Sequence, residues 1–100
     1  MKVKAKFENN KVEVKLLVKH PMDTGLQKDK NNGDIIPAKY IQELTCMHGE
    51  KLVFLANFGR AVSKDPYLAF TFSGAKVGDT LSLKWIDNLG EHEETEVVIK

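Results

Sequence analysis

Apolar and polar side chains alternate with a period of two along most of this chain, and no other feature limits its fold as strongly. The clearest stretch is residues 12–19, where four aliphatic side chains at even positions are separated mostly by charged ones. Successive side chains of a strand point to opposite faces, so this stretch predicts a strand with one buried face. The same period predicts further strands over residues 3–7, 40–47, 52–56, 67–72, 80–85 and 95–99.

Turn signals separate these predicted strands at intervals of about eight to twelve residues. They are residue types that tolerate the backbone of tight turns: Asn9-Asn10, Gly49, Gly78 and Asp87-Asn88-Leu89-Gly90. Residues 61–64 are compatible with one helical turn, and no stretch has the spacing of a longer amphipathic helix. The pattern predicts one all-β domain over residues 1–100, an immunoglobulin/fibronectin type III-like antiparallel β-sandwich of about seven strands. A small closed barrel is the alternative.

Composition argues against several classes of partner. Of the 100 residues, 42% are hydrophobic and 29% are charged, as in soluble globular domains, and the formal net charge is +1. So small a charge gives no reason to expect nucleic acid or an anionic membrane as the partner. The apolar runs are too short to span a bilayer, and the lysine-rich start lacks the hydrophobic segment of a secretory signal. Taken alone, these features favour a cytosolic chain or one exported together with another protein.

The potential metal ligands do not form a recognisable motif. Cys46 is the only cysteine, and we expect it to be buried in a strand as a small hydrophobic residue. His48 shares its face of that strand, which leaves a reactive thiol open as the alternative. His20, His48 and His92 fall in separate loops or turns. An iron site of superoxide reductase type, also built on an immunoglobulin-like sandwich, needs a fourth histidine. We predict no metal and no cofactor, with a small metal-binding redox protein as an alternative.

Acid–base catalysis is not indicated either. Glutamates cluster near the start of the last predicted strand, where such a run is typical of a solvated face and protects an edge strand from unwanted pairing. They are Glu91, Glu93, Glu94 and Glu96. The sequence has no glycine-rich phosphate loop, no His-Glu-x-x-His and no Gly-x-Ser-x-Gly. We therefore predict that the chain is not an enzyme, and a generic sandwich interaction module is a further alternative.

The longest stretch of low hydrophobicity, residues 23–34, follows a distinctive segment. Pro21 fixes its own φ and removes a backbone donor, and Gly25 permits a turn that a side chain would resist. Loops of this kind often carry recognition, and the flexible thioether of Met22 suits an exposed, adaptable contact. Two interpretations stay open, a structurally demanding loop or contact with a partner through His20, Pro21, Met22, Thr24 and Gly25.

Other candidate contacts lie in the predicted strands. Phe54 and Leu55 belong to a stretch that is apolar on both faces, so one of them should be buried only by a partner. Trp85 should lie in the core, as expected for an aromatic residue on the apolar face of a sandwich strand. Asp65-Pro66 should form a turn into the next strand, with Tyr67 packed in the core rather than in a binding site.

Three separated segments resemble one family, the SoxZ subunits of bacterial sulfur oxidation. Residues 20–25 resemble its His-Pro-Met-Glu-Thr-Gly signature, with Asp23 in place of glutamate. Residues 65–70 resemble its Asn-Pro-Tyr-Leu-Ser-Phe segment, and residues 83–87 resemble its Phe-x-Trp-x-Asp. The intervening spacing is kept by Lys28-Asp29, Gly33, Ile36-Pro37 and Tyr40-Ile41. The chain departs from the family pattern at Arg60, where proline is common, and at Leu44, where a larger aromatic residue is expected.

The resemblance implies a non-catalytic scaffold in thiosulfate and sulfur oxidation. SoxZ pairs with SoxY, whose flexible C-terminal arm bears the cysteine that carries sulfur intermediates. The present sequence ends in a predicted strand without such an arm, so we expect it to hold the carrier rather than to be the carrier. The implied partners are a SoxY-like subunit in a heterodimer and, transiently, SoxAX, SoxB and SoxCD-like enzymes. Export with a signal-bearing SoxY-like partner would make the location periplasmic.

Overall fold

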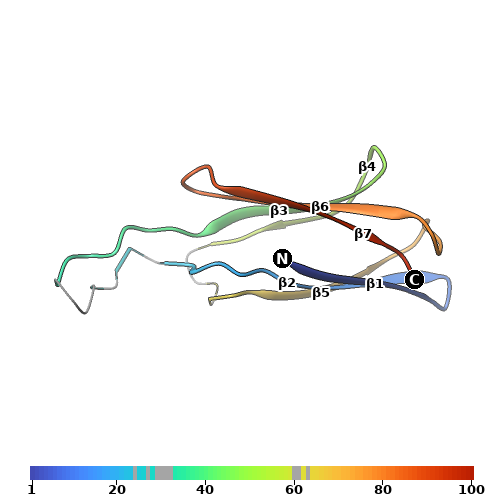
Figure 1. Cartoon of the computed structure of the whole chain (residues 1–100), viewed down its shortest axis with the longest axis horizontal. Helices are drawn as coiled ribbons and strands as arrows, with labels where there is room; N and C mark the ends of the chain where they lie inside the picture. The colour runs from blue at the N-terminus through green and yellow to red at the C-terminus, as the bar shows by residue number, and fades with distance from the viewer. Residues whose placement is uncertain (24, 27, 29–32, 60–61, 63) are drawn as a thin grey trace.

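The computed structural model describes residues 1–23, 25–26, 28, 33–59, 62 and 64–100. In these residues the chain forms strands only, arranged in two antiparallel sheets that face each other (Figure 1). The three-stranded sheet has the order β1-β2-β5, and the four-stranded sheet has the order β4-β3-β6-β7. The strands are β1 (Lys2–Glu8), β2 (Lys11–Leu17), β3 (Ile41–His48), β4 (Lys51–Asn57), β5 (Tyr67–Phe72), β6 (Thr80–Asp87) and β7 (His92–Val98). The predicted β-sandwich is confirmed, and the barrel alternative is wrong.

Short turns fix the register of the hairpins. Asn9 and Asn10 both have positive φ, 53° and 61°, between the paired residues Glu8 and Lys11. Two consecutive positive φ values match a turn whose twist suits a two-residue hairpin loop, and asparagine tolerates them better than most residues. The turn predicted from these two asparagines is confirmed, and it places the alternating side chains of β1 and β2 in phase.

The core lies between the two sheets and is filled by the alternating positions that the sequence predicts. Each of these aliphatic side chains stabilises the fold by about 1.5–3 kcal/mol when fully buried. Trp85, on β6, is also buried, as expected. The fully buried aliphatic side chains, with 1% or less of their surface exposed, are Val12, Val14, Leu16, Val18, Ile41, Leu44, Leu81, Leu83 and Ile99.

The two sides of the sandwich are closed differently. On one side the chain end pairs with β1, since Phe7 N–H donates to the carbonyl of Lys100 at 2.8 Å and Lys100 N–H donates to Ala5 at 3.0 Å. On the other side the edge strands β4 and β5 meet through the stacked rings of Phe54 and Phe70, whose centroids are 3.9 Å apart. The glutamate-rich strand β7 lies at an edge of the four-stranded sheet, in the position predicted for it.

Two expectations about the segment before β5 have different outcomes. Tyr67 was expected in the core, and this is wrong, because 61% of its surface is exposed. Leu68, Phe70 and Phe72 are the half-buried residues of β5, so the alternation places Tyr67 on the outer face. The helical turn expected at residues 61–64 lies largely outside the described residues. No helix capable of crossing a membrane is formed by the residues that the structure describes.

The segment between the end of β2 at Leu17 and the start of β3 at Ile41 projects from one end of the sandwich (Figure 1). We call this segment the arm. Its two sides approach each other at isolated antiparallel bridges between Asp23 and Lys39 and between Lys28 and Ile35. The arm accounts for the elongated shape, with principal extents of 52 × 22 × 17 Å. The distinctive segment at residues 20–25 therefore lies where the arm leaves the sandwich.

The two faces of the four-stranded sheet should respond differently to truncation. Leu44 on β3 is fully buried, so L44A should lower the free energy of unfolding by about 2–5 kcal/mol. Leu55 on β4 is 47% exposed, so L55A should cost less than about 1 kcal/mol. Urea denaturation of both variants measures the difference. Equal costs would contradict the assignment of the inner and outer faces.

Candidate functional site

The backbone of His20 is held by the turn that precedes β5. His20 N–H donates to Oδ1 of Asp65 at 2.9 Å, and Asp65 N–H donates to the carbonyl of His20 at 2.9 Å. Asp65 has a positive φ of 52°, and the next residue, Pro66, accepts from Val18 N–H at 3.0 Å. This reciprocal pairing continues the contact between β2 and β5 beyond the ends of both strands. It fixes the direction in which the chain enters the arm.

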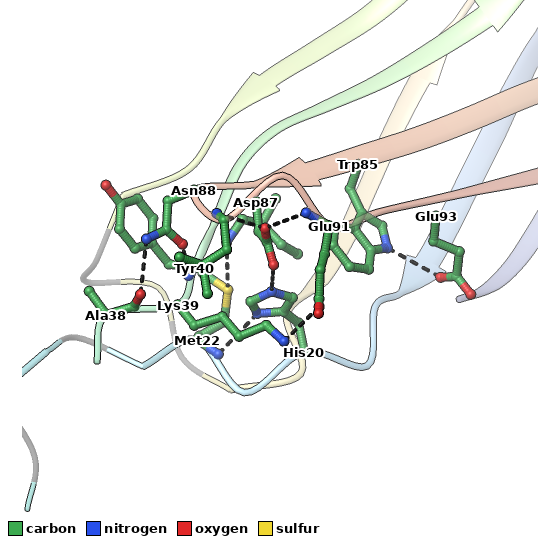
Figure 2. Close-up of polar contacts among 12 residues, drawn as sticks. His20, Met22, Ala38, Lys39, Tyr40, Trp85, Asp87, Asn88, Glu91 and Glu93 are labelled. Carbon is green, nitrogen blue, oxygen red and sulfur yellow. Dashed lines mark hydrogen bonds and ion pairs between the residues drawn. The ribbon is translucent and has the colours of Figure 1, made fainter. Parts of the chain in front are cut away.

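The ring of His20 has one tautomer that satisfies both of its partners (Figure 2). Met22 N–H donates to Nδ1 at 3.1 Å, so Nδ1 carries no proton. Nε2 must therefore carry the proton, which it donates to Oδ2 of Asp87 at 3.1 Å. Side-chain exposure is 1% for His20 and 0% for Asp87, so water does not compete for either contact. A neutral imidazole thus links the first residues of the arm to the end of β6.

Asp87 accepts hydrogen bonds at both carboxylate oxygens. Oδ1 accepts from Leu89 N–H and from Glu91 N–H, each at 2.9 Å, while Oδ2 accepts from His20. Burial alone would raise the pKa of Asp87, but the hydrogen bonds from His20, Glu91 and Leu89 outweigh it and hold the pKa below its usual value. The carboxylate is therefore ionised at neutral pH. It joins the turn after β6 to the start of the arm.

Trp85 covers the His20 ring from the side of the core. The two rings meet edge to face, with centroids 5.1 Å apart and an interplanar angle of 87°. Trp85 Nε1–H donates to Oε1 of Glu93 on β7 at 3.2 Å, so the indole has a polar partner at its outer end. The indole therefore excludes water from one side of the His20–Asp87 contact, which strengthens that contact. We call His20, Met22, Asp65, Trp85 and Asp87 the His20 cluster.

The exposure expected for Met22 is wrong. Only 4% of its surface is accessible, and its backbone has a positive φ of 51°. This left-handed turn, held by the hydrogen bond to His20, directs the side chain toward the start of β3, where Sδ accepts Ile41 N–H at 3.3 Å. A non-glycine residue in this conformation costs about 1–2 kcal/mol, which the burial and the two hydrogen bonds offset. Met22 is thus part of the support beneath the arm rather than a surface contact.

Asn88 binds the backbone of residues 38–40, where the arm leads back into β3, and this role was not predicted from the sequence. Its Oδ1 accepts Tyr40 N–H at 2.8 Å, and its Nδ2 donates to the carbonyl of Ala38 at 2.9 Å (Figure 2). Lys39, between them, forms an ion pair with Glu91 at 2.6 Å. Asp87-Asn88-Leu89-Gly90 was identified as a turn, but the pattern of a turn does not reveal which distant backbone groups its side chains bind.

The remaining candidate residues of the segment at 20–25 lie on the arm. Pro21 is exposed and Gly25 is half-buried, while Thr24 is outside the described residues. Gly25 has a φ of 84°, and a Cβ there would lie 3.1 Å from Cβ of Ala38, so both the conformation and the space favour glycine. The turn expected at this glycine is confirmed. Of the five candidates, Pro21 has the most accessible described side chain, whereas the side chain of His20 is buried inside the cluster.

Phe54 and Leu55 point to opposite faces of β4, as expected. Phe54 points inward and stacks on Phe70, whereas Leu55 lies on the outer face. Leu52, 49% exposed, lies near Leu55 on the same strand, and the pairing of β3 with β4 contains a bulge between Cys46 and Met47. β4 is an edge strand, with β3 as its neighbour in the sheet. An apolar edge of this kind is suited to contact with another protein.

The structure places the potential metal ligands apart. His20 contacts Asp87 beside the arm, while His48 contacts Asp79 at 2.9 Å near the opposite end of β3. Cys46 is fully buried between the sheets, and burial raises the pKa of its thiol to about 11. Among the residues that the structure describes, no three His, Cys, Asp or Glu side chains form a group suited to a metal ion.

The pattern of contacts joins the three segments that are far apart in the sequence. Residues 20–22, the turn at Asp65-Pro66 and residues 85–87 meet in one cluster, so their order and spacing reflect one physical unit. The sequence matches the family described as sulphur oxidation protein SoxZ over residues 1–98. The chain belongs to the SoxZ family. No protein among the curated ones compared matches it. The resemblance that these motifs carried is thereby confirmed, and it connects the chain to sulfur oxidation.

Replacing Asp87 should weaken the fold in a pH-dependent manner. D87N should cost about 1–3 kcal/mol at neutral pH, because an amide cannot accept all three hydrogen bonds and leaves buried donors unpaired. Since the folded-state pKa of Asp87 is lowered, its ionised form stabilises the fold above about pH 4, and this contribution is lost as the pH falls through the folded-state pKa. The difference in unfolding free energy between the wild type and D87N should therefore shrink in acid, as urea denaturation at several pH values would measure.

Asp79 offers a matched control. It also accepts from a histidine, but its side chain is 26% exposed, so D79N should cost less than about 1 kcal/mol. A D87N cost no larger than that of D79N, or one unchanged between neutral pH and about pH 3, would contradict the role assigned to the buried carboxylate.

Proposed function

We propose that this chain is the non-catalytic half of a sulfur-carrier heterodimer. It holds a SoxY-type subunit. The sulfur intermediates of thiosulfate oxidation are bound to a cysteine in the flexible C-terminal segment of that partner subunit. The SoxAX, SoxB and SoxCD-like enzymes that act on those intermediates meet the complex transiently. Membership of the SoxZ family supports this proposal. The structural observation that supports it most strongly is the burial of Cys46, the only cysteine of the chain.

Cys46 is poorly suited to carry sulfur itself. Thiol chemistry needs an accessible thiolate, and a cationic neighbour usually stabilises it. Cys46 is fully buried, and burial raises the pKa of its thiol to about 11, so the thiolate is scarce at neutral pH. The His48 side chain contacts Asp79, at 2.9 Å. A carrier function therefore requires a cysteine on a second chain.

The outer side of β4 supports the pairing. Leu52 and Leu55 are both about half exposed on an edge strand, and Met47 is the register partner of Leu52. Burial of such side chains against a partner sandwich would remove apolar surface from water. We propose that a SoxY-type subunit covers this strand, through its edge or its outer face.

We also propose that the complex works in the periplasm, to which a signal-bearing SoxY-type partner brings it. This rests on what the family resemblance implies for that partner. Fractionation of cells with and without the partner gene tests it. The chain should reach the periplasm only when the partner is present, and periplasmic chain in its absence would contradict joint export.

Co-expression with the SoxY-type protein of the same genome tests the pairing, with size-exclusion chromatography and intact-mass detection as readouts. The wild-type chain should elute in a one-to-one complex with sulfur adducts on the partner's arm cysteine. L55E should weaken the complex by at least about tenfold, since it would place a charge in an apolar contact. L89E is the matched control, because Leu89 is 60% exposed but lies in the turn between β6 and β7.

Circular dichroism of the isolated variants shows whether both remain folded. Separate elution of the two wild-type proteins would overturn the proposed function, as would a sulfur adduct on Cys46. A complex weakened equally by L55E and L89E would leave the pairing intact and overturn the assignment of β4 as its site.

A further inference from the structure

The outer face of the three-stranded sheet has an uneven distribution of charge. At the end near the β1–β2 turn, opposite charges face each other across the strands, with Lys6 opposite Glu13 and Glu8 opposite Lys11. At the other end, Lys4 lies opposite Lys15, and Lys2 lies opposite the exposed Leu17. Like charges directly opposite each other on a sheet destabilise it. This row contains no acidic residue, since Lys15 is paired with Lys4 on one side and with Ala69 on the other.

We call Lys2, Lys4, Lys15, Leu17 and Tyr67 the basic face. These residues line an open depression of about 270 Å³ on the outside of the sheet. Leu17 and Tyr67 are register partners that contribute apolar surface to its lining, and 61% of the surface of Tyr67 is exposed. A large apolar side chain among cations, left facing water, is the composition of a protein contact rather than of an inert surface.

Among the residues that the structure describes, two of the three lysines of the basic face have no ion-pair partner. Lys15 has a partner in Glu13 at 3.3 Å, an exposed ion pair of small energetic value. Neither Lys2 nor Lys4 forms an ion pair with a residue that the structure describes. The face therefore attracts negative charge although the formal net charge of the whole chain is only +1.

We propose that the basic face docks an acidic protein surface, one on which carboxylates surround an apolar side chain. The lysines would meet the carboxylates, and the apolar group would enter the depression beside Tyr67. Charge complementarity of this kind raises the rate of association and fixes orientation. The occupant is a protein rather than a nucleic acid, because Glu8 and Glu13 interrupt the lysines along the same face and would repel a continuous phosphate backbone.

This site goes beyond the proposed function and depends neither on the SoxY-type subunit nor on its cysteine. The basic face is the outer surface of the three-stranded sheet, whereas Leu55 is on the outer side of the four-stranded sheet. The two surfaces are therefore on opposite faces of the sandwich. A partner bound to the outer face of β4 leaves the basic face accessible.

Nuclear magnetic resonance of the full ¹⁵N-labelled chain tests the proposal. The probe is a short peptide of glutamates and leucines, and the same peptide with glutamines in place of the glutamates is its control. Addition of the acidic peptide should change the amide chemical shifts of the labelled chain mainly at Lys2, Lys4, Lys15, Leu17 and Tyr67. K4E/K15E should weaken binding about tenfold, and K51E/K84E, which reverses two lysines on the other sheet, less than about twofold. K4Q/K15Q gives the same comparison should the double reversal disturb the fold.

Five results would overturn the proposal. Shifts scattered over other surfaces, or equal shifts with the glutamine peptide, would remove the role of the basic face. The same shifts produced by sodium sulfate at matched ionic strength would show an adventitious ion site only. Tighter binding of a single-stranded oligonucleotide would indicate nucleic acid instead. Self-association of the chain in sedimentation equilibrium, lost in K4E/K15E, would identify the occupant as the acidic strand β7 of a second copy.

Discussion

The hydrogen bond from His20 to Asp87 is the contact on which the shape of this end of the molecule depends. It joins residues 67 positions apart, and both side chains are excluded from water. The same imidazole accepts the backbone N–H of Met22, so one neutral ring holds the left-handed turn at the start of the arm and the carboxylate at the end of β6. Without the imidazole, Oδ2 of the buried Asp87 carboxylate and the buried N–H of Met22 would both lack a partner, which is costly. The arm therefore leaves the sandwich in a direction that the core determines.

Most of the fold could be predicted from the period-two pattern, because one buried face per strand leaves little freedom in register. β5 began and ended where it was predicted, and the Asn9-Asn10 turn was recognised from residue types that tolerate positive φ. The pattern failed where a single backbone torsion decides the outcome. Nothing in the residue type of Met22 indicates a left-handed conformation, so its inward side chain was not predicted. The Asn88 contacts were missed for a related reason, since they depend on which distant carbonyl and N–H come within reach.

The three motifs that carried the family resemblance have a structural explanation. Their distinctive residues are those that hold the arm to both sheets, whereas the surfaces suited to other proteins lie elsewhere. The single thiol is enclosed in the core, the apolar edge strand β4 lies on one sheet, and the basic face lies on the other. A scaffold subunit of the proposed kind needs this separation, because it must hold a carrier and leave room for the proteins that act on it.

The tautomer of His20 tests the central claim most directly. A long-range ¹H–¹⁵N correlation spectrum of the imidazole rings at neutral pH distinguishes a protonated from an unprotonated ring nitrogen. The contacts predict a neutral ring with the proton fixed on Nε2, because Nδ1 accepts from Met22. A proton on Nδ1, or the averaged signals of a ring that exchanges tautomers freely, would contradict the claim that His20 links the arm to Asp87.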